Sequence, residues 1–358
     1  MTLELNAPGA YRRARDHWGS FEQHVRALEP GALVVMDQRV ARLFPRAQQA
    51  LAARKPRALV LLKAGEGVKT LHTLGKLVPH GATLSTSGTL VCVGGGTLGD
   101  LATVAAHVLR RGVNLVHVPT TLLAAVDSSL GGKGALHARG DGVTLKNALG
   151  VFHYAQACWL DAAFFQTLQN KQVKEGQVEA FKMAACLDAK AAQRWVDQVP
   201  DVVPMVRAAR GLKEGVCAQD PYDRVGVRKV LNFGHTFGHV LESVTGFRVS
   251  HGLAVGMGML CALDVGRALG VTHTADAALV EDVLRRQIGA PGRSALARAL
   301  DGVDEAHVAA LLAGDKKGAD AKGVTMVLLQ RLGKWQAQRV GRDVWRRLLR
   351  NWKAAQQP

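Results

Sequence analysis

Four side chains from residue 179 onward suit a divalent metal: Glu179, His235, His239 and His251. Zinc accepts imidazole nitrogen and carboxylate oxygen, and a catalytic zinc site keeps a coordination position open. His235 and His239 are four residues apart in GHTFGH, so a helix places both on one face and spacing alone makes both of them ligands. A lone histidine is more often an ordinary helix residue. The clustering of three histidines around GHTFGH and SHG favours a metal site.

A second group of residues suits a phosphate. Gly94–Asp100 follows a predicted strand and precedes the helical pattern LATVAAHVLRR, the setting in which backbone amides and a helix N-terminus bind a pyrophosphate. The segment fits GxGxxG, but no acidic residue follows at the usual offset of about 20 residues, so a tight turn without a ligand stays an alternative. Asp37 ends another strand, where its carboxylate could bind ribose hydroxyl groups or cap a helix. The segment 65–70 could contact a ligand or form the capped start of a helix.

These residues need a scaffold, and the pattern of the chain predicts it. The first half alternates β-branched runs with helical segments, which is typical of βαβ units and a parallel sheet. Its strand candidates are ALVVMD, ALVLLK, TLVCVGG and NLVHVP. We therefore predict an α/β Rossmann-like domain over residues 1–162. Residues 163–358 form a second, helical domain in which VTMVLLQRLGKWQ is a candidate late hairpin, and the cleft between the two is the expected active site.

Composition limits the class of protein. The chain has 358 residues, enough for two domains, and no apolar run approaches the roughly 20 residues that cross a bilayer. The five cysteines show no CxxC spacing and no signal peptide is evident, which favours the cytoplasm. The net charge is +17, but the basic residues are scattered along the chain and no nucleic-acid-binding motif accompanies them. The positive charge therefore favours steering of an anionic substrate over nucleic-acid binding.

A run of motifs after the glycine loop resembles one enzyme family. RRGVNLVHVPTTLLAAVDSSLGGK is followed by KNALGVFH, EGQVEAFK, RKVLNFGHTFGH, SHGLAVGMGM and DKKG. This order is similar to that of 3-dehydroquinate synthases, within the superfamily of sugar phosphate cyclases. The resemblance runs from about Asp37 to about Gly333. It implies an NAD-binding α/β N-terminal domain and an all-α C-terminal metal-binding domain, which agrees with the division predicted from the pattern.

The resemblance also implies roles for individual residues. The metal ligands would be Glu179, His235 and His251, whereas His239 would face the substrate phosphate. The nucleotide would be held by Asp37, Glu66, Lys69, Gly95, Gly96, Thr97, Gly99, Asp100, Thr120, Thr121, Asp127, Ser128, Lys133 and Lys146. The anionic substrate would be bound by Arg111, Lys133, Lys146, Asn147, Lys182, Lys213, Arg228, Asn232, His239, Lys316 and Lys317. Of these residues, the catalytic ones would be His239, Lys182, Asp127, Asn147, Arg228, Asn232 and Lys133.

The implied activity is that of a carbon-oxygen lyase. NAD would oxidise 3-deoxy-arabino-heptulosonate 7-phosphate transiently beside zinc or cobalt, phosphate would leave, and re-reduction and an aldol closure would give 3-dehydroquinate for the shikimate pathway and aromatic amino acid biosynthesis. The resemblance implies a small anionic sugar phosphate as partner. A homodimer is left open.

Three departures leave the substrate open. The family's GGKTG is GGKGA here, the stretch from Lys133 to Lys146 is longer than usual, and Leu253 replaces the glutamate that usually follows HG. A sister cyclase of the valiolone or deoxyinosose type is the nearest alternative. A polyol dehydrogenase of the glycerol dehydrogenase type shares a GGG loop but lacks VDSSxGGK. A non-catalytic basic relative that binds nucleic acid or serves as a scaffold is the alternative from another class.

Overall fold

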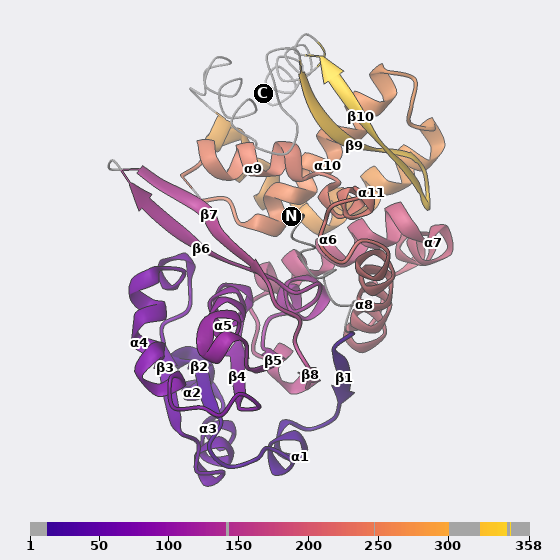
Figure 1. Cartoon of the computed structure of the whole chain (residues 1–358). Coiled ribbons are helices and arrows are strands. Elements are labelled where there is room, and N and C mark those ends of the chain that lie inside the picture. The colour runs from indigo at the N-terminus through magenta and orange to yellow at the C-terminus, as the bar shows by residue number, and fades with distance from the viewer. Residues whose placement is uncertain (1–12, 141–142, 247, 301–322, 342–343, 345–358) are drawn as a thin grey trace. The chain divides into compact units, whose positions relative to one another are not determined.

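The computed structural model describes residues 13–140, 143–246, 248–300, 323–341 and 344 (Figure 1). The chain forms two compact units. The first contains Met1–Gln169 and Lys213–Arg224, and the second contains Asn170–Leu212 and Val225–Pro358. The first unit thus extends to Gln169 and takes in a later segment of the chain. The segment Lys213–Arg224 belongs with the first unit, where Lys213 pairs with Asp127. The two predicted functional domains stay a prediction.

A six-stranded parallel sheet forms the centre of the first unit, in the order β1-β8-β5-β4-β2-β3. Four of its strands are those that the sequence predicts. The strands are β1 (Arg15–Trp18), β2 (Leu33–Asp37), β3 (Ala58–Leu62), β4 (Thr89–Gly94), β5 (Asn114–Pro119) and β8 (Ala157–Leu160). The four-residue strands β1 and β8 escaped prediction because such short runs carry no measurable periodicity.

Helices connect these strands. They are α1 (Phe21–Arg26), α2 (Gln38–Leu43), α3 (Pro45–Ala53), α4 (Leu71–Gly81) and α5 (Gly96–Val108), with the short turns η1 (Glu66–Val68), η2 (Leu109–Arg111), η3 (Ala124–Ser128) and η4 (Ala162–Phe165). An antiparallel hairpin of β6 (Lys133–Gly140) and β7 (Val143–Phe152) stands apart from the sheet. The stretch between Lys133 and Lys146, longer than in the resembling family, is thus a β-hairpin.

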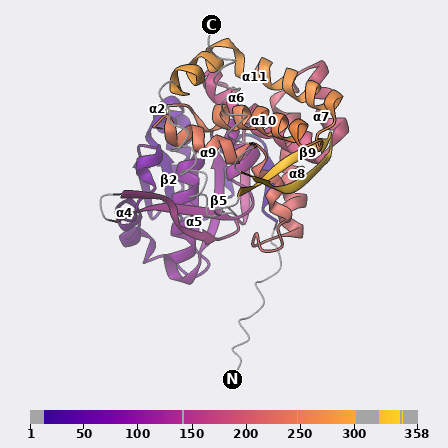
Figure 2. The same cartoon turned by 90° about the horizontal axis from the view of Figure 1, so that it is seen from above.

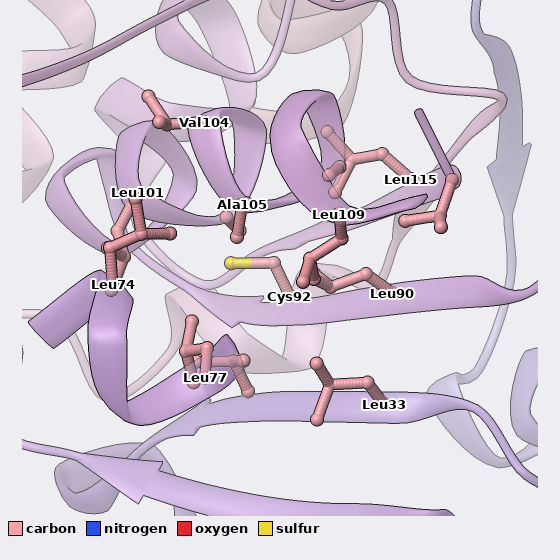
Figure 3. Close-up of a cluster of buried hydrophobic side chains, with 14 of the residues drawn as sticks. Leu33, Leu74, Leu77, Leu90, Cys92, Leu101, Val104, Ala105, Leu109 and Leu115 are labelled. Atoms are coloured by element: carbon pink, nitrogen blue, oxygen red, sulfur yellow. The ribbon is translucent and has the colours of Figure 1, made fainter. Parts of the chain in front are cut away.

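The core of this unit lies between the sheet and helices α4 and α5 (Figure 3). Leu90 and Cys92 are two residues apart on β4, so both point to the same face of the sheet. They pack with Leu33 of β2, with Leu77 of α4 and with Leu101 of α5, which are all nearly or fully buried. This packing fixes where α5 begins relative to the end of β4.

The strand order creates a switch point between β2 and β4. The chain leaves β2 towards β3 on one side and leaves β4 towards β5 on the other, so the connections that follow β2 and β4 diverge. Ligands of open parallel sheets bind outside the carboxyl ends of the strands at such a point. Asp37 ends β2 and Gly94 ends β4, so the fold places both at this edge.

The second unit is built mainly from helices, and the predicted all-α character needs correction. The helices are α6 (Asn170–Leu187), α7 (Ala189–Asp197), the first part of α8 (Val202–Gln219), α9 (His235–Val244), α10 (His251–Ala268) and α11 (Thr274–Leu300), with the turn η5 (Val227–Asn232). The chain then forms an antiparallel hairpin of β9 (Gly323–Arg331) and β10 (Lys334–Gly341). A buried apolar run that includes the β-branched residues Val324 and Val327 in β9, and a glycine at positive φ in the turn, Gly333, favour strands there.

Helix α10 is the centre of this unit and is buried on nearly all sides, against α6, α9, α11 and β9 (Figure 2). Small residues allow α9 to lie close to it. A Cβ atom on Gly258 would lie 1.9 Å from the carbonyl oxygen of Gly234 and 2.8 Å from the amide nitrogen of Gly238. Because both neighbours are backbone atoms, only glycine fits at this crossing.

We expect Gly258→Ala to destabilise the protein by about 3 kcal/mol, because backbone atoms cannot move aside as a flexible side chain can. The matched control is Gly215→Ala, at an exposed site in α8 where an added Cβ meets nothing within 4 Å. That change removes a helix-interior glycine and should stabilise by about 0.5 kcal/mol or more. Urea denaturation of both variants is the measurement. An unchanged midpoint for Gly258→Ala would show that the two helices do not depend on this close contact.

Candidate functional site

The glycine loop is followed directly by a helix, as the sequence predicts. Helix α5 begins at Gly96, and Gly95 precedes it in an extended conformation with no side-chain cap on the helix. A Cβ on Gly96 would lie 2.7 Å from the Ser128 hydroxyl, and one on Gly95 would lie 3.1 Å from a methyl carbon of Thr121. The glycines therefore let η3 and the residues before it approach the loop. The uncapped N–H groups at the start of α5 suit a phosphate.

A buried ion pair stands beside this loop. Lys69 is 4% exposed, and its Nζ lies 2.6 Å from Asp100 Oδ2 and donates to Asn147 Oδ1 at 2.6 Å. Burial raises the pKa of Asp100, and the Lys69 ammonium acts against that rise. The Gly65 amide donates to the Thr97 hydroxyl at 3.2 Å. Four predicted site residues, Lys69, Asp100, Asn147 and Thr97, are thus brought together by the fold.

His137 is a residue of this site that no sequence pattern predicts. It lies on β6 and is 9% exposed, and its Nδ1 accepts the backbone N–H of Asn147 at 3.1 Å. Its proton is therefore on Nε2, which donates to Glu66 Oε2 at 2.7 Å. Glu66 is half-exposed, so His137 orients a carboxylate that is still accessible to a ligand. No motif marks His137, because its partner lies 71 positions away.

Two further predicted cations of the first unit are held by carboxylates. Lys213 donates to the backbone carbonyl of Asp127 at 2.6 Å and to its Oδ1 at 2.7 Å, which fixes the π-helical turn η3. Lys133 is 2.6 Å from Asp223 Oδ2 and lies over the ring of Phe152. Asp127 and Lys213 were predicted separately, and the fold makes them a pair.

Other predicted residues of the first unit differ in their setting. Asp37 Oδ1 accepts from the Arg39 amide at 2.9 Å and caps α2, as its alternative interpretation predicts. Thr120 is buried after β5, and Lys146 is exposed on β7. Arg111 precedes β5, at the amino edge of the sheet opposite the glycine loop. The fold of this unit therefore does not bring Arg111 to the other predicted residues.

The predicted metal ligands meet in the second unit. Glu179 of α6, His235 at the start of α9 and His251 at the start of α10 offer ligand atoms that all lie within 4.8 Å of one another. Glu179 Oε1 is 3.7 Å from His235 Nε2 and 3.5 Å from His251 Nε2. Within the described chain no donor meets Oε1 with hydrogen-bond geometry, although Glu179 is fully buried. A cation between one carboxylate and two imidazoles would satisfy this oxygen, so the donor set fits a divalent metal.

Neighbouring groups orient the three candidate ligands. His251 Nδ1 lies 3.3 Å from Glu242 Oε1, and His235 Nδ1 lies 3.3 Å from the carbonyl oxygen of Phe233. These contacts leave both Nε2 atoms directed at Glu179, the arrangement by which a carboxylate or carbonyl orients a metal-binding imidazole. Glu242 was not predicted, and nothing in its local sequence distinguishes it from a solvent-facing helix residue.

Charges around the cluster shift its titration. Burial acts to raise the pKa of Glu179, but Lys182, which pairs with Oε2, and the two histidines lower it well below its ordinary value. Burial, together with Lys182, lowers the pKa of His235 well below its ordinary value. Burial also acts to lower the pKa of His251, but the carboxylates of Glu179 and Glu242 raise it to about 10. The cluster therefore keeps a charged carboxylate in an apolar helix core.

Predicted substrate residues of the second unit lie on elements next to this cluster. Lys182 is 1% exposed and donates to the Leu231 carbonyl at 2.7 Å, which ties α6 to η5. Buried Arg228 and half-buried Asn232 belong to η5. His239 lies outside the grouped ligands and is exposed, with its ring centroid 5.4 Å from that of His235. Lys316 and Lys317 lie outside the described residues, so their predicted role is not tested.

Comparison with known proteins identifies the family. The model described as 3-dehydroquinate synthase N-terminal matches residues 59–175, and the model described as 3-dehydroquinate synthase C-terminal matches residues 156–318. The chain belongs to the 3-dehydroquinate synthase family, a family of enzymes.

Curated relatives agree with this assignment. The chain is 34% identical over 334 residues to the 3-dehydroquinate synthase of a Bradyrhizobium species, covering 88% of this chain and 85% of the relative. It is 36% identical over 324 residues to that of Rhodospirillum rubrum, covering 86% and 81%. It is 37% identical over 293 residues to that of Pyrobaculum neutrophilum, covering 78% and 81%.

Solved structures share the fold. A 2-deoxy-scyllo-inosose synthase in complex with carbaglucose-6-phosphate, NAD+ and Co2+ is 23% identical and has a TM-score of 0.79, with 96% of this chain and 98% of that chain covered. A 2-epi-5-epi-valiolone synthase from Streptomyces hygroscopicus, with NAD+ and Zn2+ bound, is 21% identical with a TM-score of 0.77 and coverage of 98% and 99%. No helix within the described residues is long and apolar enough to cross a membrane.

We expect the purified protein to bind one divalent metal ion per chain, and Glu179→Ala and His251→Ala to abolish tight binding. Glu242→Gln should weaken binding by about 10-fold to 100-fold, because it alters only the orientation of His251. His273→Ala, an exposed histidine of the same unit, is the control. Metal content after dialysis and competition with a chelator measure the effect. Equal metal retention by the Glu179→Ala and His273→Ala proteins would contradict the assignment.

Proposed function

We propose that this chain is a 3-dehydroquinate synthase, which converts 3-deoxy-arabino-heptulosonate 7-phosphate to 3-dehydroquinate and inorganic phosphate. The observation that carries the proposal is the cluster of Glu179, His235 and His251 in a chain of this family. Such a donor set with open positions suits a metal that binds substrate hydroxyl groups. The reaction class is elimination of phosphate with transient oxidation, so NAD is not consumed.

We propose zinc for the second unit and NAD for the carboxyl edge of the sheet in the first. When bound, the metal would acidify a substrate hydroxyl, and the nicotinamide would accept a hydride and return it. Two features support the nucleotide site: the start of α5 offers N–H groups to a pyrophosphate, and Glu66 presents an accessible carboxylate. Titration of the metal-depleted protein with Zn2+ and Co2+ decides which metal restores more activity.

Side chains of the second unit would bind the substrate anion. Lys182 is held by Glu179 and by the Leu231 carbonyl, so its ammonium stays at the cluster when a ligand binds. Arg228 and Asn232 on η5 add a cation and an amide for carboxylate or phosphate oxygens. His239 is exposed one helical turn after His235, where an imidazole can exchange a proton with the leaving phosphate.

In the first unit, we propose that the Asp127–Lys213 pair and the β6–β7 hairpin support the nucleotide site. Lys213 fixes η3, and η3 carries Ser128 next to Gly96. The hairpin carries Lys133, Lys146 and Asn147. Since Asn147 accepts from Lys69, the lengthened hairpin is bonded to the nucleotide side and is not a detached insertion.

With the heptulosonate phosphate, Zn2+ and NAD, we expect the protein to release one phosphate per dehydroquinate formed. NADH should not accumulate. His239→Asn should lower kcat by about 100-fold while metal content stays unchanged, since a general acid or base contributes on the order of 10²-fold or more. Phosphate release and dehydroquinate absorbance are the measurements, with His273→Asn as the control.

The same assay separates the alternative functions. Phosphate release from another sugar phosphate but not from the heptulosonate would indicate a sister cyclase. Accumulation of NADH from a polyol would indicate a dehydrogenase. Salt-dependent retention of DNA without phosphate release from any heptulose would indicate the basic binding relative. Each of these outcomes would replace the proposed activity.

We expect His137→Ala to raise the Kd for NAD by about 10-fold, because the hydrogen bond that orients Glu66 is lost. At saturating NAD, kcat should be unchanged. His137→Gln keeps an N–H donor and should recover part of the affinity, whereas His72→Ala changes an exposed histidine of α4 and should have no effect. Fluorescence titration of NAD is the measurement. Equal NAD affinity for the His137→Ala and His72→Ala proteins would show that His137 has only a structural role.

A further inference from the structure

A separate cavity lies in the second unit. It has a volume of about 360 Å3 and is enclosed by the first turns of α6, the segment before α10, and α11. This is within the size range of small-molecule sites. Neither the three candidate metal ligands nor the predicted substrate residues line it. The cavity is therefore distinct from the metal cluster, although Val178 and Ser250 in its wall are neighbours of Glu179 and His251 in the chain.

Polar groups in the cavity wall have no partner in the protein. Gln287 of α11 is 5% exposed and lines the cavity, and no described residue forms a hydrogen bond with its amide. The hydroxyl of Ser250 is also buried without a hydrogen-bond partner among the described residues. A buried amide normally finds a partner, because leaving it unsatisfied costs about 1 to 3 kcal/mol. The Gln287 amide can be satisfied by a ligand with an oxygen acceptor.

The charges at the cavity indicate that such a ligand is an anion. Lys171, Lys174 and Arg248 line it, and none of them forms an ion pair among the described residues. The Nε of Arg248 donates to the Thr245 carbonyl, which fixes the side chain. The two outer nitrogens of the guanidinium are left to donate to a ligand. Glu175 is the single acid in the wall, so the cations outnumber it. An anionic group would be attracted by the excess of positive charge.

The rest of the wall is apolar. Val178, Val249, Leu253 and Ile288 supply it, and Leu253 stands where the resembling family carries a glutamate. A glutamate at this position would place a carboxylate among the three cations. Leucine instead leaves the three cations in excess over Glu175 and adds an apolar surface for the body of a ligand. Inorganic phosphate uses the cations but gains nothing from these side chains, whereas a ring with a carboxylate uses both.

We propose that this cavity is a binding site for a small aromatic or alicyclic carboxylate. The carboxylate lies among Lys171, Lys174 and Arg248 and accepts from the Gln287 amide, and the ring packs on Val178, Leu253 and Ile288. The inference is independent of the proposed activity, because it uses none of the residues that the proposed reaction needs.

Benzoate is the probe, and isothermal titration calorimetry of the full chain measures its affinity. Benzyl alcohol is the neutral analogue with the same ring, and inorganic phosphate is the anion without a ring. We expect benzoate to bind with one site per chain, at least 10-fold more tightly than either. Leu253→Glu should weaken benzoate binding at least 10-fold. The matched control is Leu71→Glu, which adds the same charge at a leucine that is 59% exposed in the first unit.

Lys174→Met is the second variant and keeps the test decisive if Leu253→Glu fails to fold. It should weaken benzoate binding at least 10-fold, whereas Lys190→Met, at an exposed lysine of α7, should not. Three results would overturn the proposal: benzyl alcohol binding as tightly as benzoate, phosphate displacing benzoate at equal concentration, or Leu253→Glu and Lys174→Met binding benzoate as the unmodified chain does.

Discussion

A charged carboxylate buried in a helix core is the constraint on which the second unit depends. Glu179 is fully buried, and an isolated ionised carboxylate there would be strongly unfavourable. Lys182 one turn further along α6 and the imidazoles of His235 and His251 compensate it. Since these partners come from three helices, α6, α9 and α10 have to meet at one point, and the glycines at the α9–α10 crossing allow that approach. The geometry of the candidate metal centre and the packing of the three helices therefore depend on each other.

In the first unit, backbone N–H groups and a few charged side chains lie together at one edge of a sheet. The apolar faces of β2, β4 and β5 and of helices α4 and α5 hold that edge rigid. Lys69, Asp100 and Asn147 then connect the glycine loop to the β6–β7 hairpin. A hairpin of unusual length is thus tied into the site through side-chain bonds.

Much of the site could be predicted from the sequence, but its supporting residues could not. Glu179, His235 and His251 carry chemistry that is visible in their residue types and in motifs shared with a family. Glu242 and His137 act by orienting such residues, and an acid or a histidine in that role has no local signature. Lys213 was predicted as a substrate residue, yet its pairing with Asp127 depends on a return of the chain to the first unit that no pattern indicates.

The sequence by itself determined the parallel sheet, most of the helices, the glycine loop and the identity of the candidate ligands, because hydrophobic periodicity and turn residues act over short distances along the chain. It did not determine the strands β1 and β8, the bonding of the β6–β7 hairpin, or the cavity around Leu253 and Gln287. Those features arise where residues far apart in the chain meet. Their partners are chosen by packing and charge compensation, and only the tertiary structure decides them.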